Sequence, residues 1–215
     1  MLSPADSTSP SATPPFDDAL SARATPFARD DDRPHSPVAR WPRWLAAELR
    51  SDHAGETGAV QIYLGILAIS RDPELRAFAR HHLSTEQHHL EILESIRPTV
   101  PRSRLLVLWR PAGWLTGALP ALFGARAVYA TIAAVETFVD HHYAQQLDRL
   151  DATLALRPDA ALEALRAQLG ACRDDELRHR DEALAAGPAR GALAALWAWC
   201  VGFGSAAAVA LARRL

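Results

Sequence analysis

The sequence predicts an all-α protein: a four-helix bundle with additional apolar helices, preceded by a disordered N-terminal tail. Alternation of apolar and polar residues, as in strands, does not extend over any useful length. Long stretches of helical character are separated by proline and glycine breaks. Two Glu-x-x-His motifs each follow a lone glutamate 30 or 40 residues upstream, which is the ligand pattern of a two-metal site in a four-helix bundle.

The first 40 residues have the composition of a disordered tail. They hold seven of the fifteen prolines, six serines and the acidic run Asp30-Asp31-Asp32. The apolar segment of a secretory signal is missing from them, and their acidic residues argue against a mitochondrial transit peptide. We therefore expect residues 1–40 to be a tail and residues 41–215 to form one domain.

The first two helices are marked by their end signals. The first is expected from about residue 42 to 70. Asp72-Pro73-Glu74 then starts the second, with Asp as the N-cap and Pro in the first helical position. This second helix is expected to end near residue 97, because Pro98 follows.

Three further helices are expected in the second half. After a stretch rich in Pro, Gly, Trp and Leu at 98–125, one helix covers about 126–156. The break Arg157-Pro158-Asp159 precedes the next, which ends near residue 186 at Gly187-Pro188. A fifth helix covers about 191–213. The first two helices and the next two look like two copies of one αα-hairpin.

The composition fits an ordinary globular core. Hydrophobic residues make up 49% of the chain, and the formal net charge of −2 gives no sign of nucleic-acid binding. The two cysteines, Cys172 and Cys200, form no C-x-x-C pair and fit a reducing compartment. Cys172 lies one turn before Glu176 and could face the same site, but we expect it to be a small core residue.

The two Glu-x-x-His motifs exceed what composition alone would produce. With ten Glu and nine His in 215 residues, random placement gives about 0.4 such pairs. Residues three apart lie on one helix face, so Glu86 and His89 can point at one metal, as can Glu176 and His179. The alternative is a set of surface salt-bridging residues on ordinary helices.

The lone glutamates, Glu56 and Glu136, would complete the site as bridging or capping carboxylates. Carboxylate oxygen and imidazole nitrogen suit iron or manganese. Four carboxylates carry a charge of −4, which two divalent ions would balance. Without metal, buried carboxylates repel one another and some become protonated, so metal binding should be coupled to the stability of the bundle.

Two apolar segments lie outside the four ligand-bearing helices. Residues 191–212 carry no charge over 22 positions, and three interpretations remain open: a transmembrane span, a buried helix packed on the bundle, or a helix docked into a membrane surface. Residues 105–123 are interrupted by Arg110, Pro111 and Pro120, which make a poor span, whereas Trp109 and Trp114 suit an interface. The segments suggest a lipid-soluble substrate and peripheral membrane attachment; a large core is the alternative.

Four stretches carry a resemblance to a known family. They are Arg50-Ser-Asp-His-Ala-Gly-Glu-Thr-Gly-Ala59 with Ile62-Tyr63, Glu86-Gln-His-His-Leu90, Val135-Glu136 with His141-His142-Tyr143, and Arg173-Asp-Asp-Glu-Leu-Arg-His179 with Asp181. On these residues the chain resembles the demethoxyubiquinone hydroxylase family, ferritin-like di-iron proteins of ubiquinone biosynthesis. The resemblance covers about residues 41–215 and implies a ferritin-like bundle.

The resemblance also implies residue roles. The expected bridges between the two irons are Glu86 and Glu176, and Tyr143 and His142 are expected beside the site, where they could steer a proton or an electron. The expected iron ligands are Glu56, Glu86, His89, Glu136, Glu176 and His179.

Three positions depart from the family's pattern. His53 stands where Gln is common, Asp140 where a small residue is common, and Arg180 where His is common. Asp140 lies one turn from Glu136, and we expect it to be solvated or salt-bridged rather than to face the metals. Among the other polar residues, His82 is the best spare ligand but is expected at the bundle edge.

His88 is expected to be solvated. Glu91 and Glu94 are expected on a charged outer face of the helix. Tyr63 is either redox-active or simple core.

The implied activity is that of an O2-dependent di-iron monooxygenase of the 3-demethoxyubiquinol 3-hydroxylase type. Its substrate would be a prenylated demethoxy-ubiquinol of the 2-polyprenyl-3-methyl-6-methoxy-1,4-benzoquinol type, with NADH or the quinol as reductant. The expected location is peripheral, on the cytoplasmic face of a bacterial cell membrane, as a homo-oligomer or within a ubiquinone-biosynthesis complex. The alternatives are another ferritin-like di-iron oxidase or peroxidase, and an iron-storage protein.

Overall fold

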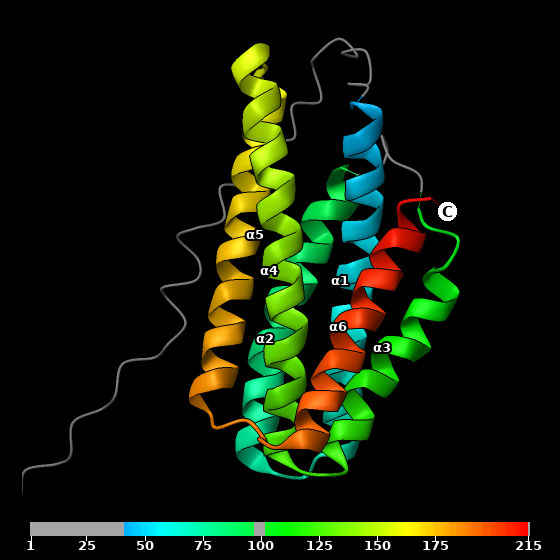
Figure 1. Ribbon diagram of the computed structural model, residues 1–215, viewed down its shortest axis with the longest axis vertical. Helices are drawn as coiled ribbons and strands as arrows, with labels where there is room; N and C mark the ends of the chain where they lie inside the picture. The colour runs from blue at the N-terminus through cyan, green and yellow to red at the C-terminus, as the bar shows by residue number, and fades with distance from the viewer. Residues whose placement is uncertain (1–40, 97–101, 215) are drawn as a thin grey trace, which may run out of the picture. The chain divides into compact units, whose positions relative to one another are not determined.

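A computed structural model describes residues 41–96 and 102–214, and this part of the chain is all helical, with no strand (Figure 1). The all-α prediction is therefore confirmed, and the five expected helices lie close to their expected bounds. The predicted tail at 1–40 lies outside the described residues. The helices are α1 (Arg43–Ile69), α2 (Pro73–Ile96), α3 (Leu106–Ala121), α4 (Ala125–Leu156), α5 (Ala160–Ala185) and α6 (Ala192–Ala212).

Helices α1, α2, α4 and α5 form the bundle, with α3 packed along α1 and α6 packed against α4 and α1 (Figure 1). The apolar core divides into two clusters. One cluster contains Leu45 of α1 and Leu169 of α5, and the other contains Ile66 of α1 and Ala183 of α5. On each bundle helix the glutamate of the predicted site lies between residues of these two clusters, so a polar layer separates two apolar ones.

The N-terminal caps of α2 and α5 follow the sequence signals. Oδ1 of Asp72 accepts hydrogen bonds from the backbone N–H groups of Glu74 and Leu75 at 2.9 and 3.3 Å, with Pro73 as the first helical residue. Asp159 accepts from two backbone N–H groups of the first turn of α5 in the same way. Each cap satisfies donors that the helix itself cannot.

The apolar stretch with internal prolines forms helix α3, which continues through Pro111 and Pro120. Its backbone lies directly against that of α1. A Cβ atom added to Gly117 would overlap the carbonyl oxygen of Ile62, and one added to Gly113 would overlap that of Gly58. The glycines of α3 are thus required by the close approach of two helices, and this packing outweighs the poor helix propensity of the segment.

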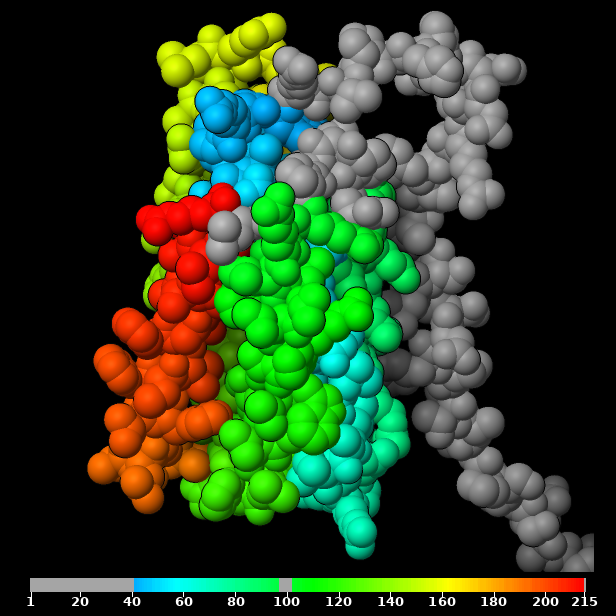
Figure 2. All heavy atoms as spheres, turned by 90° about the vertical axis from the view of Figure 1, so that its right-hand side faces the viewer, coloured from blue at the N-terminus to red at the C-terminus, as the bar shows by residue number. Residues whose placement is uncertain are grey.

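Helix α6 is long and apolar enough to cross a membrane by length and composition alone, and only 6% of its most apolar window is buried. The helix packs on the bundle, as one of the three interpretations expected, but it is not buried there. The helix is attached at both ends: Nε1 of Trp197 donates to Oγ1 of Thr131 at 2.8 Å, and Arg213 pairs with Glu48 at 2.7 Å. Figure 2 shows α6 and α3 on one face of the molecule.

Candidate metal centre

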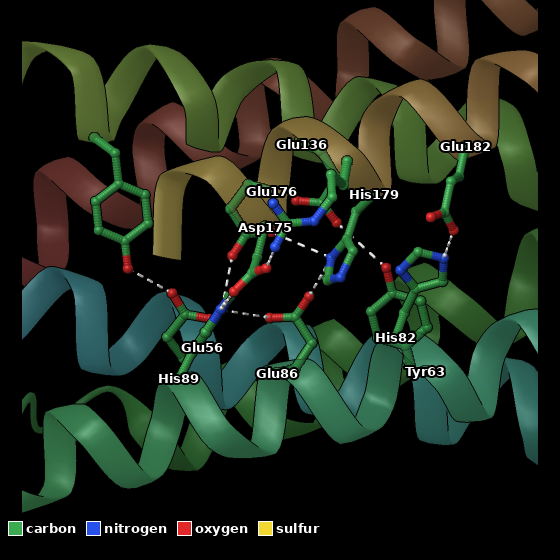
Figure 3. Close-up of polar contacts among 12 residues, drawn as sticks. Glu56, Tyr63, His82, Glu86, His89, Glu136, Asp175, Glu176, His179 and Glu182 are labelled. Carbon is green, nitrogen blue, oxygen red and sulfur yellow. Dashed lines mark hydrogen bonds and ion pairs between the residues drawn. The ribbon is translucent and has the colours of Figure 1, made fainter. Parts of the chain in front are cut away.

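All six predicted ligand residues are buried and meet in the centre of the bundle (Figure 3). Their exposed fractions are 4% or less. Each bundle helix contributes through the face that it turns inward, and the i, i+3 spacing of each Glu-x-x-His motif places both of its side chains there. The contributions are Glu56 from α1, Glu86 and His89 from α2, Glu136 from α4, and Glu176 and His179 from α5.

The six side chains form two overlapping groups whose ligand atoms lie within 4.8 Å of one another. One group consists of Glu56, Glu86, His89 and Glu176, and the other of Glu86, Glu136, Glu176 and His179. The carboxylates of Glu86 and Glu176 belong to both groups. The geometry therefore offers two neighbouring positions for metal ions, each with three carboxylates and one imidazole, that share two carboxylates.

The atoms at the centre of the site have no hydrogen-bond partner among the described residues, which fits metal ligands. Nδ1 of His89 lies 3.0 Å from Oε1 of Glu176, and Nδ1 of His179 lies 3.0 Å from Oε1 of Glu86. These contacts are short, yet both nitrogens and all four oxygens of Glu86 and Glu176 lack hydrogen bonds of acceptable geometry. Buried polar atoms are rarely left in this state. Lone pairs that converge on a common point are what a cation requires.

Burial and charge make the site retain protons when no cation is present. Desolvation raises the pKa of Glu56 to about 8, and the neighbouring Glu176 and Glu86 add to this rise although contacts from His89 oppose it. Burial raises the pKa of Glu136 as well. Burial alone would lower the pKa of His179, but contacts with Glu176 and Glu86 raise it to about 9. Two divalent ions would remove the need for these protons.

Further polar residues orient the ligand residues. Nε2 of His89 lies 3.1 Å from Oδ2 of Asp175, so the ring is fixed by a carboxylate on the side away from the site. The hydroxyl of Tyr143 donates to Oε1 of Glu56 at 2.7 Å, and that of Tyr63 donates to Oε1 of Glu136 at 3.4 Å. The role of Asp175 was missed by sequence reasoning, because an acidic residue beside a ligand in sequence is not by itself a signal.

Tyr143 and His142, the two residues expected beside the site, have different surroundings. Whereas Tyr143 contacts Glu56, His142 places Nε2 2.7 Å from Oδ1 of Asp52 and Nδ1 3.2 Å from Nη2 of Arg213. A guanidinium only donates, so Nδ1 of His142 accepts and Nε2 donates to Asp52. His142 therefore belongs to a network that joins α1, α4 and the end of α6.

The structure corrects the expectation for His82, which is not at the bundle edge. Its side chain is fully buried, packed at a ring distance of 4.1 Å against both Phe78 and His179, with Nε2 3.1 Å from Oε2 of Glu182 (Figure 3). Because α2 carries polar residues on several faces, its sequence does not mark which face turns inward. The i, i+4 relation to Glu86 was the available signal.

Other expectations were confirmed. Asp140 is salt-bridged, to Arg173 at 2.7 Å and to Arg180 at 3.3 Å, so two of the three departures from the family's pattern are partners of each other. The third, His53, lies 2.8 Å from Oε1 of Glu94.

Cys172 is a buried core residue. His88 is exposed, with a side chain that is 64% accessible. Glu91 is exposed too, whereas Glu94 is partly buried and contacts both Arg102 and His53.

A cavity of about 330 Å³ lies between α1, α3, α4 and α6 and reaches the carboxylates of Glu56, Glu86, Glu136 and Glu176. Neither His89 nor His179 lines it. The cavity therefore approaches the two candidate metal positions from the side opposite the imidazoles. Its wall is mostly apolar and in places carries no side chain: a Cβ atom at Gly55, Gly58 or Gly204 would meet nothing within 4 Å.

Comparison with known proteins agrees with this architecture. Residues 43–212 match the family described as "Ubiquinone biosynthesis protein COQ7". A protein of Rhodospirillum rubrum named 3-demethoxyubiquinol 3-hydroxylase is 37% identical over 194 residues, which cover 84% of each chain.

More distant relatives carry similar names. A Caenorhabditis elegans protein named NADPH-dependent 3-demethoxyubiquinone 3-hydroxylase, mitochondrial, is 30% identical over 169 residues, covering 78% of this chain and 88% of the relative. The Saccharomyces cerevisiae protein named 5-demethoxyubiquinone hydroxylase, mitochondrial, is 33% identical over 158 residues, covering 66% and 65%. Because the family match spans the whole described bundle, this chain belongs to the COQ7 family of ubiquinone biosynthesis proteins.

Proposed function

We propose that this protein is a di-iron monooxygenase that hydroxylates the ring of a prenylated demethoxy-ubiquinol in ubiquinone biosynthesis. The observation that carries the proposal is the cavity: its wall is mostly apolar, and it reaches four carboxylates that could hold two metal ions. A lipid-like ring compound fits such a wall, and relatives in the family are named for hydroxylation of this ring.

Iron is the proposed metal: Glu56 and His89 would hold it at one position, Glu136 and His179 at the other, and Glu86 and Glu176 could contribute to both. Bound iron would supply the redox chemistry with O2 that protein side chains lack. Hydroxylation places one oxygen atom of O2 on the ring and reduces the other to water, which requires two electrons and two protons. A reduced pyridine nucleotide or the quinol itself is the proposed electron source, and the C. elegans relative is named NADPH-dependent.

The protein's own contribution is to position the ring and exclude water. Small residues on α1 and α6 leave a space beside the carboxylates, and the histidines are on the far side, so the ring and O2 would approach from the cavity. The hydroxyl of Tyr143 remains protonated, because burial and the nearby carboxylate of Glu56 raise its pKa well above the usual value. It therefore acts as a permanent donor to Glu56.

The exposed face of α3 and α6 is proposed to rest on the membrane that holds the substrate, with the protein on the cytoplasmic side. Large apolar side chains are exposed on α3 and α6. These helices also wall the cavity, and both lie on the face seen in Figure 2. The polar attachments of Trp197 and Arg213 keep α6 on the bundle, which favours a docked helix over a separate span. The exposed side chains include Val107, Leu108, Leu115, Leu193, Leu196, Trp199 and Phe203.

The ligand assignment is tested by mutation. Glu176→Ala and His179→Ala should each abolish hydroxylation and lower the iron content well below two per chain. His88→Ala is the matched control, because this exposed histidine lies outside the site. Full iron and full activity in the Glu176→Ala protein would refute the assignment.

The substrate is tested by complementation of a ubiquinone-deficient strain that lacks this hydroxylation step, with quinone profiling. The demethoxy intermediate should accumulate without the gene and disappear with it. An iron-storage protein would leave the quinone profile unchanged and would run as a large shell on size exclusion.

A further inference from the structure

The indole N–H of Trp109 is buried without an acceptor. Its Nε1 atom has no hydrogen-bond partner among the described residues, although Trp109 lines the cavity beside Ala112, Gly113 and Thr116 on one face of α3. Buried indole N–H groups usually find a partner, since leaving a donor unpaired in an apolar environment is unfavourable. A donor in this state at a cavity wall indicates that its acceptor comes from a ligand.

Several other donors of the cavity wall are used within the protein, and the hydroxyl of Ser205, which also lines the cavity, is not a buried unpaired atom. Trp197 donates from Nε1 to Thr131, Thr116 donates to the carbonyl oxygen of Ala112 at 2.9 Å, and Tyr143 donates to Glu56. Ser51 donates to the carbonyl oxygen of Glu48 at 2.8 Å. Within the described part of the chain, the indole N–H of Trp109 is the one donor of the lining that is both buried and without a hydrogen-bond partner.

The cavity that this donor lines has room for a ring. Gly55 of α1 and Gly204 of α6 also line it, and a Cβ atom at either would meet nothing within 4 Å. The donors described above lie on the walls, while the acceptor-rich carboxylates lie at one end. A ring that carries oxygen substituents would bring the missing acceptor, and a pure hydrocarbon would not.

We propose that the indole N–H of Trp109 donates a hydrogen bond to an oxygen substituent of the substrate ring and thereby sets which ring edge faces the carboxylates. This assignment rests on the proposed function, because it takes the ligand to be a prenylated benzoquinone or benzoquinol. Trp109 is then a binding residue that sets orientation, and it takes no part in the redox step.

The test compares Trp109→Phe with Trp197→Phe in the iron-loaded protein without reductant, so that no turnover occurs. Two probes are titrated calorimetrically: a methoxy-methyl-benzoquinone with one prenyl unit, and the prenylated methylbenzene that lacks ring oxygens. Trp109→Phe should weaken binding of the quinone about 3- to 10-fold and leave that of the hydrocarbon within about 2-fold, as expected for one lost neutral hydrogen bond.

The control variant separates this effect from a change in packing. Trp197→Phe removes a donor that is already bonded within the protein, so it should lower the thermal unfolding midpoint and leave the ratio of the two affinities unchanged. Trp109→Phe loses no internal bond and should unfold at the wild-type temperature or higher. In protein labelled with ¹⁵N-tryptophan, the Nε1–H resonance that Trp109→Phe removes should shift downfield when the quinone binds.

The outcomes are distinguishable. Equal quinone affinity in wild type and Trp109→Phe would overturn the assignment of this donor and leave the proposed function intact. Equal weakening of both probes would also overturn it, because the loss would then be one of shape. A wild-type protein that binds neither probe would refute the proposed substrate class, and this inference with it.

Discussion

The hydroxyl of Tyr143 donates a 2.7 Å hydrogen bond to Oε1 of Glu56, across the interface between α4 and α1. This bond fixes the orientation of a carboxylate that would bind one metal ion only. Tyr143→Phe removes it while keeping the ring in the core. We expect the affinity for the first divalent ion to fall about 10-fold, the lower end of what outer partners of metal ligands contribute.

A competition titration with a chromogenic chelator measures this change. Tyr129→Phe is the control, because the partly buried Tyr129 packs against Phe78 away from the carboxylates. An unchanged affinity in Tyr143→Phe would mean that packing alone orients Glu56.

The metal-free protein should lose stability as pH rises from about 6.5 to 9. In the folded state Glu56 has a pKa of about 8 instead of 4.5, and His179 one of about 9 instead of 6.5. Both groups bind protons more tightly folded than unfolded, so their contribution is present below the unfolded pKa and is lost as pH passes the folded one. The lowered pKa of His82, about 3, acts in the opposite direction but only below its unfolded value of 6.5.

Metal should reverse this dependence. The ions bind deprotonated ligands, so their affinity increases with pH over the same window. Thermal unfolding midpoints of the metal-free and metal-loaded proteins should therefore diverge as pH rises. Parallel curves for the two forms would contradict a site built on these titrating residues.

The contact of α3 with α1 can be tested by two glycine substitutions of opposite expected sign. Gly117→Ala forces a methyl group onto the carbonyl oxygen of Ile62 and should reduce the free energy of unfolding by about 1–3 kcal/mol. In contrast, Gly170→Ala on α5 meets only the end of the Arg166 side chain at 3.9 Å and should raise it by about 0.5–1 kcal/mol. Denaturant unfolding measures both, and a neutral Gly117→Ala would mean that the helices can separate freely.

The proposed membrane face can be tested with one variant on α6 and one control variant on α4. Trp199 and Phe203 stack at 5.5 Å on the exposed side of α6 and are 64% and 65% accessible. Replacing both with Ser should sharply reduce cosedimentation with anionic phospholipid vesicles. Leu156→Ser should have no effect, since this residue is 90% exposed but lies at the far end of α4. Equal losses of cosedimentation in both variants would indicate nonspecific hydrophobic adsorption to the vesicles and would contradict a docking face on α6.

The bundle and the residues that meet at its candidate metal centre could be predicted because local rules determine them. Asp72-Pro73 and Asp159 are caps that act within one turn, and the i, i+3 spacing of Glu86 and His89 places both side chains on one face whatever surrounds them. Helix α3 was not assigned, because its prolines and glycines oppose a helix locally. Only the tertiary contact of Gly117 with α1 makes those glycines favourable.

Contacts between residues far apart in sequence could not be predicted either. The contact of His142 with Arg213 joins residues 71 positions apart, and that of Arg213 with Glu48 joins residues 165 apart. No spacing rule links such residues, since they meet only after the helices are packed. The cavity and the free donor of Trp109 are likewise properties of the assembled walls.

The sharing of Glu86 and Glu176 has a consequence for how ions enter. Each metal position draws three residues from one αα-hairpin and a single carboxylate from the other, so neither half of the chain contains a complete position. An ion that binds first would link the two hairpins and thereby order both shared carboxylates for its neighbour. Loading should accordingly be cooperative, with empty and doubly occupied molecules outnumbering singly occupied ones at half saturation.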